Sequence, residues 1–364
     1  MTAPIRRHTR TVVVGGVPIG SRHPIVIQSM LKSPPSDVEA AVRETARLAE
    51  AGCGIIRLAV PDSNALAPLK AFCKSSPLPV VADIHFDPRL AVGAIEAGVS
   101  KVRLNPGNLK DEGEIRRIVS LCKDRGIPIR VGANSGSIRR RDGSDDRPIA
   151  QALVSGVIEY CQLIESFGFH DIVVSLKASD VLTNTLIYRE VALRTDYPLH
   201  LGLTATGPAD EGRVKSDIAL GSLLVDGIGD TIRVSLTAPP IEEVRAACNI
   251  LRGMGILCDR PIILSCPTCG RCEVDIAAAV EEVRSATAGI CRPLRIAVMG
   301  CVVNGPGEAA DCDFGVACGR GKAVLFASGK PVETVSAAGM IPALLKLIER
   351  SENIRKEPSS SEPL

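Results

Sequence analysis

The sequence predicts an α/β fold, namely a TIM (β/α)8 barrel followed by a small α/β domain. Over the first two thirds of the chain, short apolar runs alternate with helical stretches, and this part has the length of about 250 residues that is usual for such a barrel. Hydrophobic residues make up 45% and aromatic residues only 2%, a composition typical of α/β cores. A doubly wound sheet is the alternative, but no Gly-x-Gly-x-x-Gly follows the first strand.

The predicted barrel strands are apolar runs short enough for buried parallel strands. They cover residues 25–27, 54–60, 80–84, 102–104, 127–131, 172–176, 199–203 and 232–236. Helical periodicity between them predicts helices that include residues 38–51, 115–125, 150–167 and 241–253. This order of elements matches a parallel barrel with an outer ring of helices.

The pattern changes after Gly253. Strands are expected at 261–265, 294–299, 313–317 and 322–327, with helices at 274–286 and 341–350. We therefore predict a barrel over residues 1–258 and a second domain over 261–350. Residues 351–364 are rich in Ser, Glu and Pro and are expected to be a disordered tail.

Charge and hydropathy exclude several classes of function. Lys and Arg number 43 against 41 for Asp and Glu, a net charge of +2, which is no footprint for nucleic acid or an anionic membrane. No apolar run approaches the ~20 residues that span a bilayer. Near the N-terminus, Gly15, Gly16 and Pro18 interrupt the apolar stretch before it reaches signal-peptide length. We expect a cytoplasmic protein.

Polar side chains follow the predicted barrel strands, at the face that carries the chemistry of TIM barrels. Any one of these residues alone is most simply a solvated or salt-bridged surface side chain. Four arginines and a lysine at successive strand ends, however, should converge at the solvent-accessible mouth of the barrel. Arg gives bidentate donors and Lys a compact charge, which suits a phosphate or diphosphate. In chain order the residues are Gln28, Arg57, Asp83, His85, Arg103, Asn105, Arg130, Asn134, Ser175, Lys177, His200, Thr204, Arg233 and Ser235.

The cysteines indicate a metal or redox site in the last third of the chain. There are 13, an odd number in a chain large enough to fold without disulfides, and seven of them lie between Cys266 and Cys318. Cys266-x2-Cys269 occurs in both zinc and iron–sulfur sites. No histidine follows Arg260, so a closed zinc site there would need cysteines alone.

A second strand delivers Cys301 into a Gly-rich turn, and Glu308 follows close by. Three thiolates and a carboxylate suit a [4Fe–4S] cluster in which one iron lacks a cysteine, so that a substrate oxygen can bind that iron. Cys272 is the competing third ligand, because Cys-x2-Cys-x2-Cys resembles part of a ferredoxin motif.

Two segments, 265–271 and 298–308, resemble the cluster motifs of the 4-hydroxy-3-methylbut-2-enyl diphosphate synthase family, iron–sulfur enzymes of the non-mevalonate isoprenoid pathway. The resemblance covers nearly the whole chain, and further matching segments are 81–87, 101–108, 128–132, 176–180 and 229–236. It implies a TIM barrel followed by a domain whose [4Fe–4S] ligands are Cys266, Cys269, Cys301 and Glu308.

The family opens 2-C-methylerythritol 2,4-cyclodiphosphate and removes a hydroxyl with two electrons from ferredoxin or flavodoxin. The resemblance also implies a homodimer in which the cluster domain of one chain caps the barrel of the other. The positions that match its diphosphate-binding set are Arg57, Arg103, Arg130, Lys177, Arg233 and Ser235, and Asp83, Asn134 and His200 would line the same pocket.

The chain departs from the family at two places. Leu31-Lys32-Ser33 stands where the family has Thr-Asn-Thr, and Ala205 replaces a Glu thought to serve in proton transfer. Asp83, Asp210 and Glu211 are candidates for the missing acid, and an acidic segment at 207–212, expected to be a flexible loop, favours relocation to Asp210 or Glu211. Two alternatives stay open: a divergent relative acting on another diphosphate, and a non-catalytic protein that binds a diphosphate or a cluster.

Overall fold

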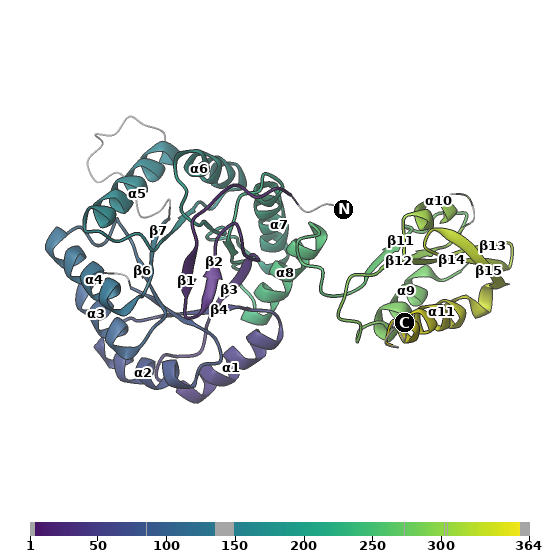
Figure 1. Cartoon of the computed structure of the whole chain (residues 1–364), viewed down its shortest axis with the longest axis horizontal. Coiled ribbons are helices and arrows are strands. Elements are labelled where there is room, and N and C mark those ends of the chain that lie inside the picture. Colours follow the sequence, from purple (N-terminus) through teal and green to yellow (C-terminus); the bar gives the residue numbers. More distant parts are fainter. Residues whose placement is uncertain are drawn as a thin grey trace, which may run out of the picture. The chain divides into compact units, whose positions relative to one another are not determined.

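The computed structural model describes residues 4–84, 86–134, 149–272, 274–301, 303 and 305–356. The chain divides into two compact units, Met1–Leu257 and Cys258–Leu364, and each has its own hydrophobic core. Figure 1 shows the first unit as strands enclosed by a ring of helices.

The first unit is the predicted TIM barrel. Its parallel strands are hydrogen-bonded in the order β8-β7-β6-β5-β4-β3-β10-β9, and a parallel bridge between Val174 and Leu199 joins β8 to β9. The strands are β3 (Val26–Met30), β4 (Ile55–Ala59), β5 (Val80–Asp83), β6 (Lys101–Leu104), β7 (Ile129–Asn134), β8 (Ile172–Lys177), β9 (His200–Leu201) and β10 (Thr231–Ile232).

The helices of the ring begin where the sequence supplies capping groups. The side chains of Asp37, Asp87, Asp111 and Asp180 accept backbone N–H bonds at the starts of four of them. The ring consists of α1 (Val38–Glu50), α2 (Leu66–Ser75), α3 (Pro88–Ala97), α4 (Glu112–Arg125), α5 (Ile149–Ser166), α6 (Val181–Arg194), α7 (Ala209–Val225) and α8 (Pro240–Gly253).

A short hairpin that the sequence did not predict, β1 (Val12–Val14) and β2 (Val17–Ile19), precedes the barrel. Its buried Val14 and Ile19 form an apolar cluster with Ile55 and Val81, which lie in the first halves of β4 and β5. The hairpin therefore closes the amino end of the barrel with apolar side chains.

The second unit is an α/β domain with a sheet in the order β11-β12-β13-β14-β15. The parallel strands are β11 (Ile262–Ser265), β12 (Arg295–Met299) and β13 (Phe314–Gly319), and β14 (Lys322–Ala327) and β15 (Lys330–Ser336) continue antiparallel. Helices α9 (Ile276–Ala286) and α11 (Met340–Lys356) pack on one core, and Ala309 of the short α10 (Gly305–Ala310) belongs to another. These elements position the loops that carry the cysteines.

Two expectations change at the end of the chain. Residues 351–356 belong to α11 rather than to a disordered tail, because the apolar face of this helix continues to pack through Ile348 and the helix propagates beyond it. Residues 357–364 lie outside the described part. In the part that is described, no helix has the length and apolar character that a membrane crossing requires.

Candidate active site

The interior of the barrel is lined with cations where most TIM barrels pack apolar layers. Side chains of a strand alternate between its two faces, and the inward positions here hold charged groups that are almost entirely buried. Arg130, the most buried of the arginines, is only 2% exposed. The cations are Arg57, Lys101, Arg103, Arg130, Lys177 and Arg233.

The structure corrects the expected position of two of these site residues. Arg130 was expected at a solvent-accessible strand end, but it is the second residue of β7, because this strand runs from Ile129 to Asn134 rather than from Ile127 to Val131. His200 is the first residue of β9 and is fully buried. Both therefore lie inside the barrel rather than at its rim.

Two carboxylates are paired with the cations of the described barrel interior. Asp83 lies 3.2 Å from Nη1 of Arg103 and 3.8 Å from Nε of Arg57, and Glu243 of α8 lies 3.6 Å from Nη2 of Arg233. The cations outnumber these carboxylates. The interior therefore has a strong excess of positive potential. Such buried charge without compensation is costly in free energy.

Several donors of this cluster have no hydrogen-bond partner among the described residues. They include Nε and Nη1 of Arg130, Nε of Arg57, Nε of Arg103 and Nε2 of His200, all buried. Buried polar groups in native proteins are otherwise almost always paired. Polar atoms that lack hydrogen bonds, on mostly cationic side chains gathered inside one barrel, are the arrangement that an anionic ligand completes.

Burial and mutual repulsion act together on the protonation of these groups. Desolvation is the largest cause that lowers the pKa of Lys177, followed by the charges of Arg233 and Arg57. The same two causes lower the pKa of His200, whose Nδ1 lies 2.7 Å from Oγ1 of Thr231. An anion bound in this space would counter both effects, since an opposite charge favours the protonated forms.

Close backbone packing fixes the Lys177 ammonium. A Cβ atom at Gly202 would lie 2.6 Å from Nζ of Lys177 and 2.7 Å from the carbonyl oxygen of Arg233. Only glycine leaves room for this approach. The segment after β9 therefore supports the cation cluster directly.

Lys101 is a buried cation of the barrel interior that the sequence analysis missed. The expected strand began at Val102, whereas β6 begins at Lys101, which is fully buried. The signal was present, because Lys101 and Arg103 are two positions apart and so share a face of the strand.

The remaining predicted residues of the barrel take varied positions. Asn134 ends β7, and Ser235, three residues beyond β10, is partly exposed. Asp210 and Glu211 are exposed in the first turn of the helix α7, not in a flexible loop, because the chain turns helical directly after Pro208. His85 lies outside the described residues.

Ala205 is exposed and has a φ of 52°, in the left-handed region. The other departure from the family, Leu31 to Ser33, is held by hydrogen bonds. Oγ of Ser33 donates to Oε2 of Glu44 at 2.6 Å, and Nζ of Lys32 donates to the carbonyl oxygens of Leu236 and Ala238. Lys32 thereby links the loop after β3 to the loop after β10.

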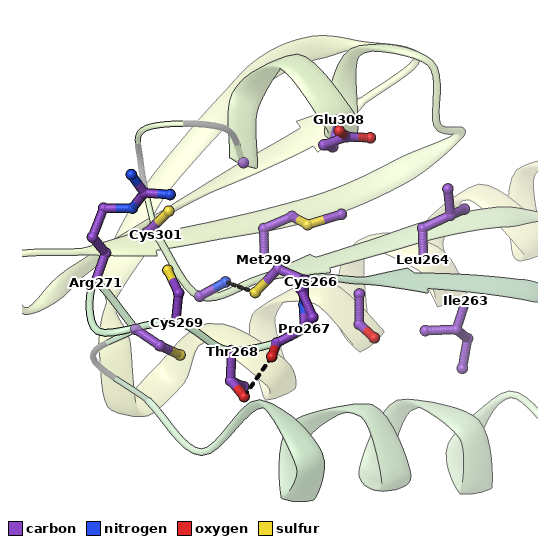
Figure 2. Close-up of a pocket in the computed structure, with 14 residues that line it drawn as sticks. Ile263, Leu264, Cys266, Pro267, Thr268, Cys269, Arg271, Met299, Cys301 and Glu308 are labelled. Carbon is purple, nitrogen blue, oxygen red and sulfur yellow. Dashed lines mark hydrogen bonds between the residues drawn. The ribbon is translucent and has the colours of Figure 1, made fainter.

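The second unit holds a pocket of about 580 Å³ that is lined by Cys266, Cys269, Cys301 and Glu308, the four predicted metal ligands. Cys272, the competing ligand, also lines it. Figure 2 shows Cys269 and Cys301 near Arg271, and Glu308 on α10 across the pocket. The thiols come from the loops after β11 and β12, two neighbouring parallel strands.

The loops prepare two of the thiols as acceptors. The backbone N–H of Gly300 donates to Sγ of Cys266 at 3.3 Å, and hydrogen bonds from the backbone and side chain of Arg271 lower the pKa of Cys269. Thiolates are the form that binds metal. Cys272 differs, because its Sγ donates to the carbonyl oxygen of Val274 at 3.1 Å and packs against Gly300.

These side chains line the wall of a pocket and do not converge on one point. Within the described ranges, no three Cys, His, Asp or Glu side chains are grouped so that they could hold a single metal ion. A polynuclear cluster binds each thiolate at a different iron, so its ligands are distributed around it. The donor set of thiols and one carboxylate fits such a group.

Fold and sites together define a class of protein: a TIM-barrel protein with buried cations inside the barrel and a second domain with a cysteine-lined pocket. Two sequence families match this chain. The GcpE TIM-barrel domain matches residues 9–248, and the GcpE protein C-terminal domain matches residues 262–350.

Known relatives agree with that match. A protein of Persephonella marina named 4-hydroxy-3-methylbut-2-en-1-yl diphosphate synthase (flavodoxin) is 47% identical over 350 residues, which cover 95% of this chain and 99% of the relative. The Salinispora tropica protein of the same name is 45% identical over 343 residues, with 94% and 88% covered. This chain belongs to the GcpE family of 4-hydroxy-3-methylbut-2-en-1-yl diphosphate synthases.

Among solved structures, dihydropteroate synthase of Yersinia pestis superposes with a TM-score of 0.51 at 11% identity, over 68% of this chain and 98% of the other. At this identity the likeness concerns the fold alone, and it agrees with the barrel.

Proposed function

We propose that this chain converts 2-C-methylerythritol 2,4-cyclodiphosphate to 4-hydroxy-3-methylbut-2-enyl diphosphate, with flavodoxin as the electron donor. The observation that carries this proposal is the 45–47% identity to synthases of that name over almost the whole chain. The reaction opens the cyclic diphosphate, consumes two electrons together with protons, and releases water.

The cations inside the barrel support the substrate class. A cyclic diphosphate brings negative charge that would pair with Nε of Arg57 and Arg103 and with Nε and Nη1 of Arg130, atoms without a hydrogen bond among the described residues. Charge-assisted bonds of this kind are the strong ones. In our proposal Lys177, Arg233 and Ser235 complete the diphosphate site, and Asp83, Asn134 and His200 line it.

We propose that Cys266, Cys269, Cys301 and Glu308 hold a [4Fe–4S] cluster in the pocket of the second unit. When bound, such a cluster supplies electrons one at a time together with a Lewis-acidic iron. The thiol of Cys272 is engaged with Val274, which supports Cys301 as the third cysteine ligand.

The assembly of the two sites belongs to the same proposal. We infer a homodimer in which the second unit of one chain meets the barrel of its partner, as the family resemblance implies. The thiol-rich pocket needs a reducing compartment, so we propose that the protein works in the cytoplasm.

The test is an anaerobic assay of the purified chain, reconstituted with iron and sulfide, with the cyclodiphosphate and reduced flavodoxin. We expect formation of 4-hydroxy-3-methylbut-2-enyl diphosphate. A fully loaded protein that binds the cyclodiphosphate and forms no product would contradict the proposed activity.

Ala205 motivates one second candidate, a divergent relative that acts on another diphosphate. The position is exposed and left-handed, and it carries a methyl group where the family has an acid. Turnover of a different diphosphate under the same conditions, without turnover of the cyclodiphosphate, would favour this candidate.

A further inference from the structure

Lys101 has a position that the proposed reaction does not explain. It is the first residue of β6, it is fully buried, and its Nζ has no hydrogen-bond partner among the described residues. Its register partner on β5 is Val81, a member of the apolar cluster with Val14 and Ile19 of the hairpin. The ammonium group of Lys101 therefore lies where the apolar floor of the barrel meets the cations.

The charges that face Lys101 come from nearly every strand of the barrel. The acids among them are engaged elsewhere, Asp83 with Arg103 and Arg57, and Glu243 with Arg233. Burial, followed by the charges of Arg130 and Arg57, lowers the pKa of Lys101 to about 7. The charged and titratable groups of the barrel interior are Arg57 on β4, Asp83 on β5, Arg103 on β6, Arg130 on β7, Lys177 on β8 and His200 on β9, with Arg233 directly after β10 and Glu243 on α8.

We propose that Lys101 takes up a proton when a diphosphate binds in the barrel, so that ligand binding in this chain is coupled to protonation at the floor of the site. The inference rests on the proposed function, because it takes the barrel interior as the diphosphate site. The proton comes from solvent and forms one N–H bond on Nζ, and no bond of the ligand changes.

The direction of the coupling follows from electrostatics. A bound anion favours the charged form of a nearby amine and raises its pKa. Below about pH 7, Lys101 already carries its proton and binding takes up none at this residue. Above that pH, binding takes up as much as about one proton, and the affinity falls about tenfold for each pH unit.

The experiment uses the full chain and the cyclodiphosphate, without reductant so that no turnover occurs. Each phosphate of this ligand has a single, strongly acidic group, so its charge is constant near neutral pH. Titration calorimetry at pH 8 in two buffers of different ionisation enthalpy measures the protons taken up. We expect wild type to take up between half a proton and one proton more than Lys101→Met.

A second variant and a second pH separate Lys101 from its neighbours. Lys101→Arg stays charged at every pH used, so it should bind the ligand without the additional proton, and it serves if Lys101→Met does not fold. Burial and the surrounding cations hold the pKa of His200 well below its usual range, so uptake by His200 would appear at lower pH than uptake by Lys101.

The possible failures are distinguishable. Equal proton uptake at pH 8 by wild type, Lys101→Met and Lys101→Arg would overturn the inference and leave the proposed function intact. Absence of any cyclodiphosphate binding by the wild-type chain would overturn both. The expected result is that both variants take up between half a proton and one proton less than wild type at pH 8, and that their affinity changes correspondingly less between pH 7.5 and 8.5.

Discussion

The barrel interior and the cysteine pocket place their functional groups in opposite ways. In the barrel, Arg103, Arg130 and Lys177 lie on strands whose register is fixed by neighbours on both sides, and they are buried. In the second unit, Cys269 and Glu308 are exposed, on a loop and on the short helix α10. The barrel site is held by the fold even at an electrostatic cost, whereas we expect the cysteine pocket to depend on its ligand for order.

The largest expected effect tests the dependence of the cysteine pocket on its ligand. Cys301→Ser should abolish cluster binding and therefore all turnover, because we propose only three cysteine ligands for the cluster. Wild type prepared without oxygen should contain about four irons and four sulfides per chain. Iron and sulfide analysis with visible absorption measures this.

Cys272→Ser is the matched control, a cysteine of the same pocket that is engaged with Val274. It should keep the iron. The reverse order of the two variants would make Cys272 the third ligand, and one zinc per chain in wild type would replace the cluster altogether. The barrel should unfold at the same temperature in both variants, since its core is separate.

The second effect concerns an acid that the barrel lacks. General acid–base catalysis contributes about 10²–10⁴-fold in rate, so Ala205→Glu should raise turnover by at least about 100-fold, with little change in substrate affinity. Asp210 and Glu211 are exposed on α7, and Glu211 lies 3.6 Å from Lys215, which argues against relocation. Steady-state kinetics of reconstituted protein is the measurement.

Asp210→Asn and Glu211→Gln are the controls, and each should leave turnover within a few-fold of wild type. If either removes most of the activity while Ala205→Glu changes little, the acid has moved to α7. If none of the three matters, the proton reaches the product from elsewhere, and Asp83 becomes the next residue to replace.

The two sites also differ in how well the sequence predicts them, because one lies on loops and the other on buried strands. The cysteines that line the pocket were singled out from the sequence, because loop residues with rare chemistry stand out there, and the choice of Cys301 over Cys272 stays a prediction. The barrel cations were found as residue types, but the depth of Arg130 and the role of Lys101 were not, since each depends on where a strand begins within two residues. The hairpin β1–β2 was missed because strands of three residues carry almost no periodic signal.

The third effect tests whether the barrel holds its cations for a ligand. Arg130→Met replaces a buried, unpaired charge by an apolar side chain of similar length. Substrate affinity should fall about 10- to 150-fold, since a bond to a charged group contributes about 1.5–3 kcal/mol. The melting temperature without ligand should be unchanged or higher, because repulsion among the cations decreases.

Asp83→Asn is the matched variant, because it removes a negative charge from the barrel interior where Arg130→Met removes a positive one. It removes the carboxylate that pairs with Arg103 and Arg57, so the unliganded chain should lose stability. Calorimetric melting and ligand titration of both variants give the answer. A lower melting temperature for Arg130→Met with unchanged affinity would make Arg130 a structural residue.

The smallest effect compares backbone strain in the two regions. Ala205 in the barrel and Thr268 between two cysteines both have a left-handed φ, 52° and 49°. For a residue with a Cβ this conformation costs about 1 kcal/mol, and a β-branched Thr is the greater outlier. Glycine relieves the cost but gains freedom in the unfolded chain, so Ala205→Gly should add about 0.5 kcal/mol to the free energy of unfolding.

Thr268→Gly is the corresponding variant in the cysteine pocket. Thr268 lies between Cys266 and Cys269, and its Oγ1 donates to the carbonyl oxygen of Pro267 at 2.8 Å. Replacement relieves strain and also loosens a loop that no sheet register holds. We expect Thr268→Gly to release iron to a chelator faster than wild type, whereas Ala205→Gly leaves that rate unchanged. Equal rates of iron release by wild type, Thr268→Gly and Ala205→Gly would mean that the chain itself, and not the bound metal, orders the cysteine loop. The barrel site and the cysteine pocket would then differ only in the exposure of their functional groups.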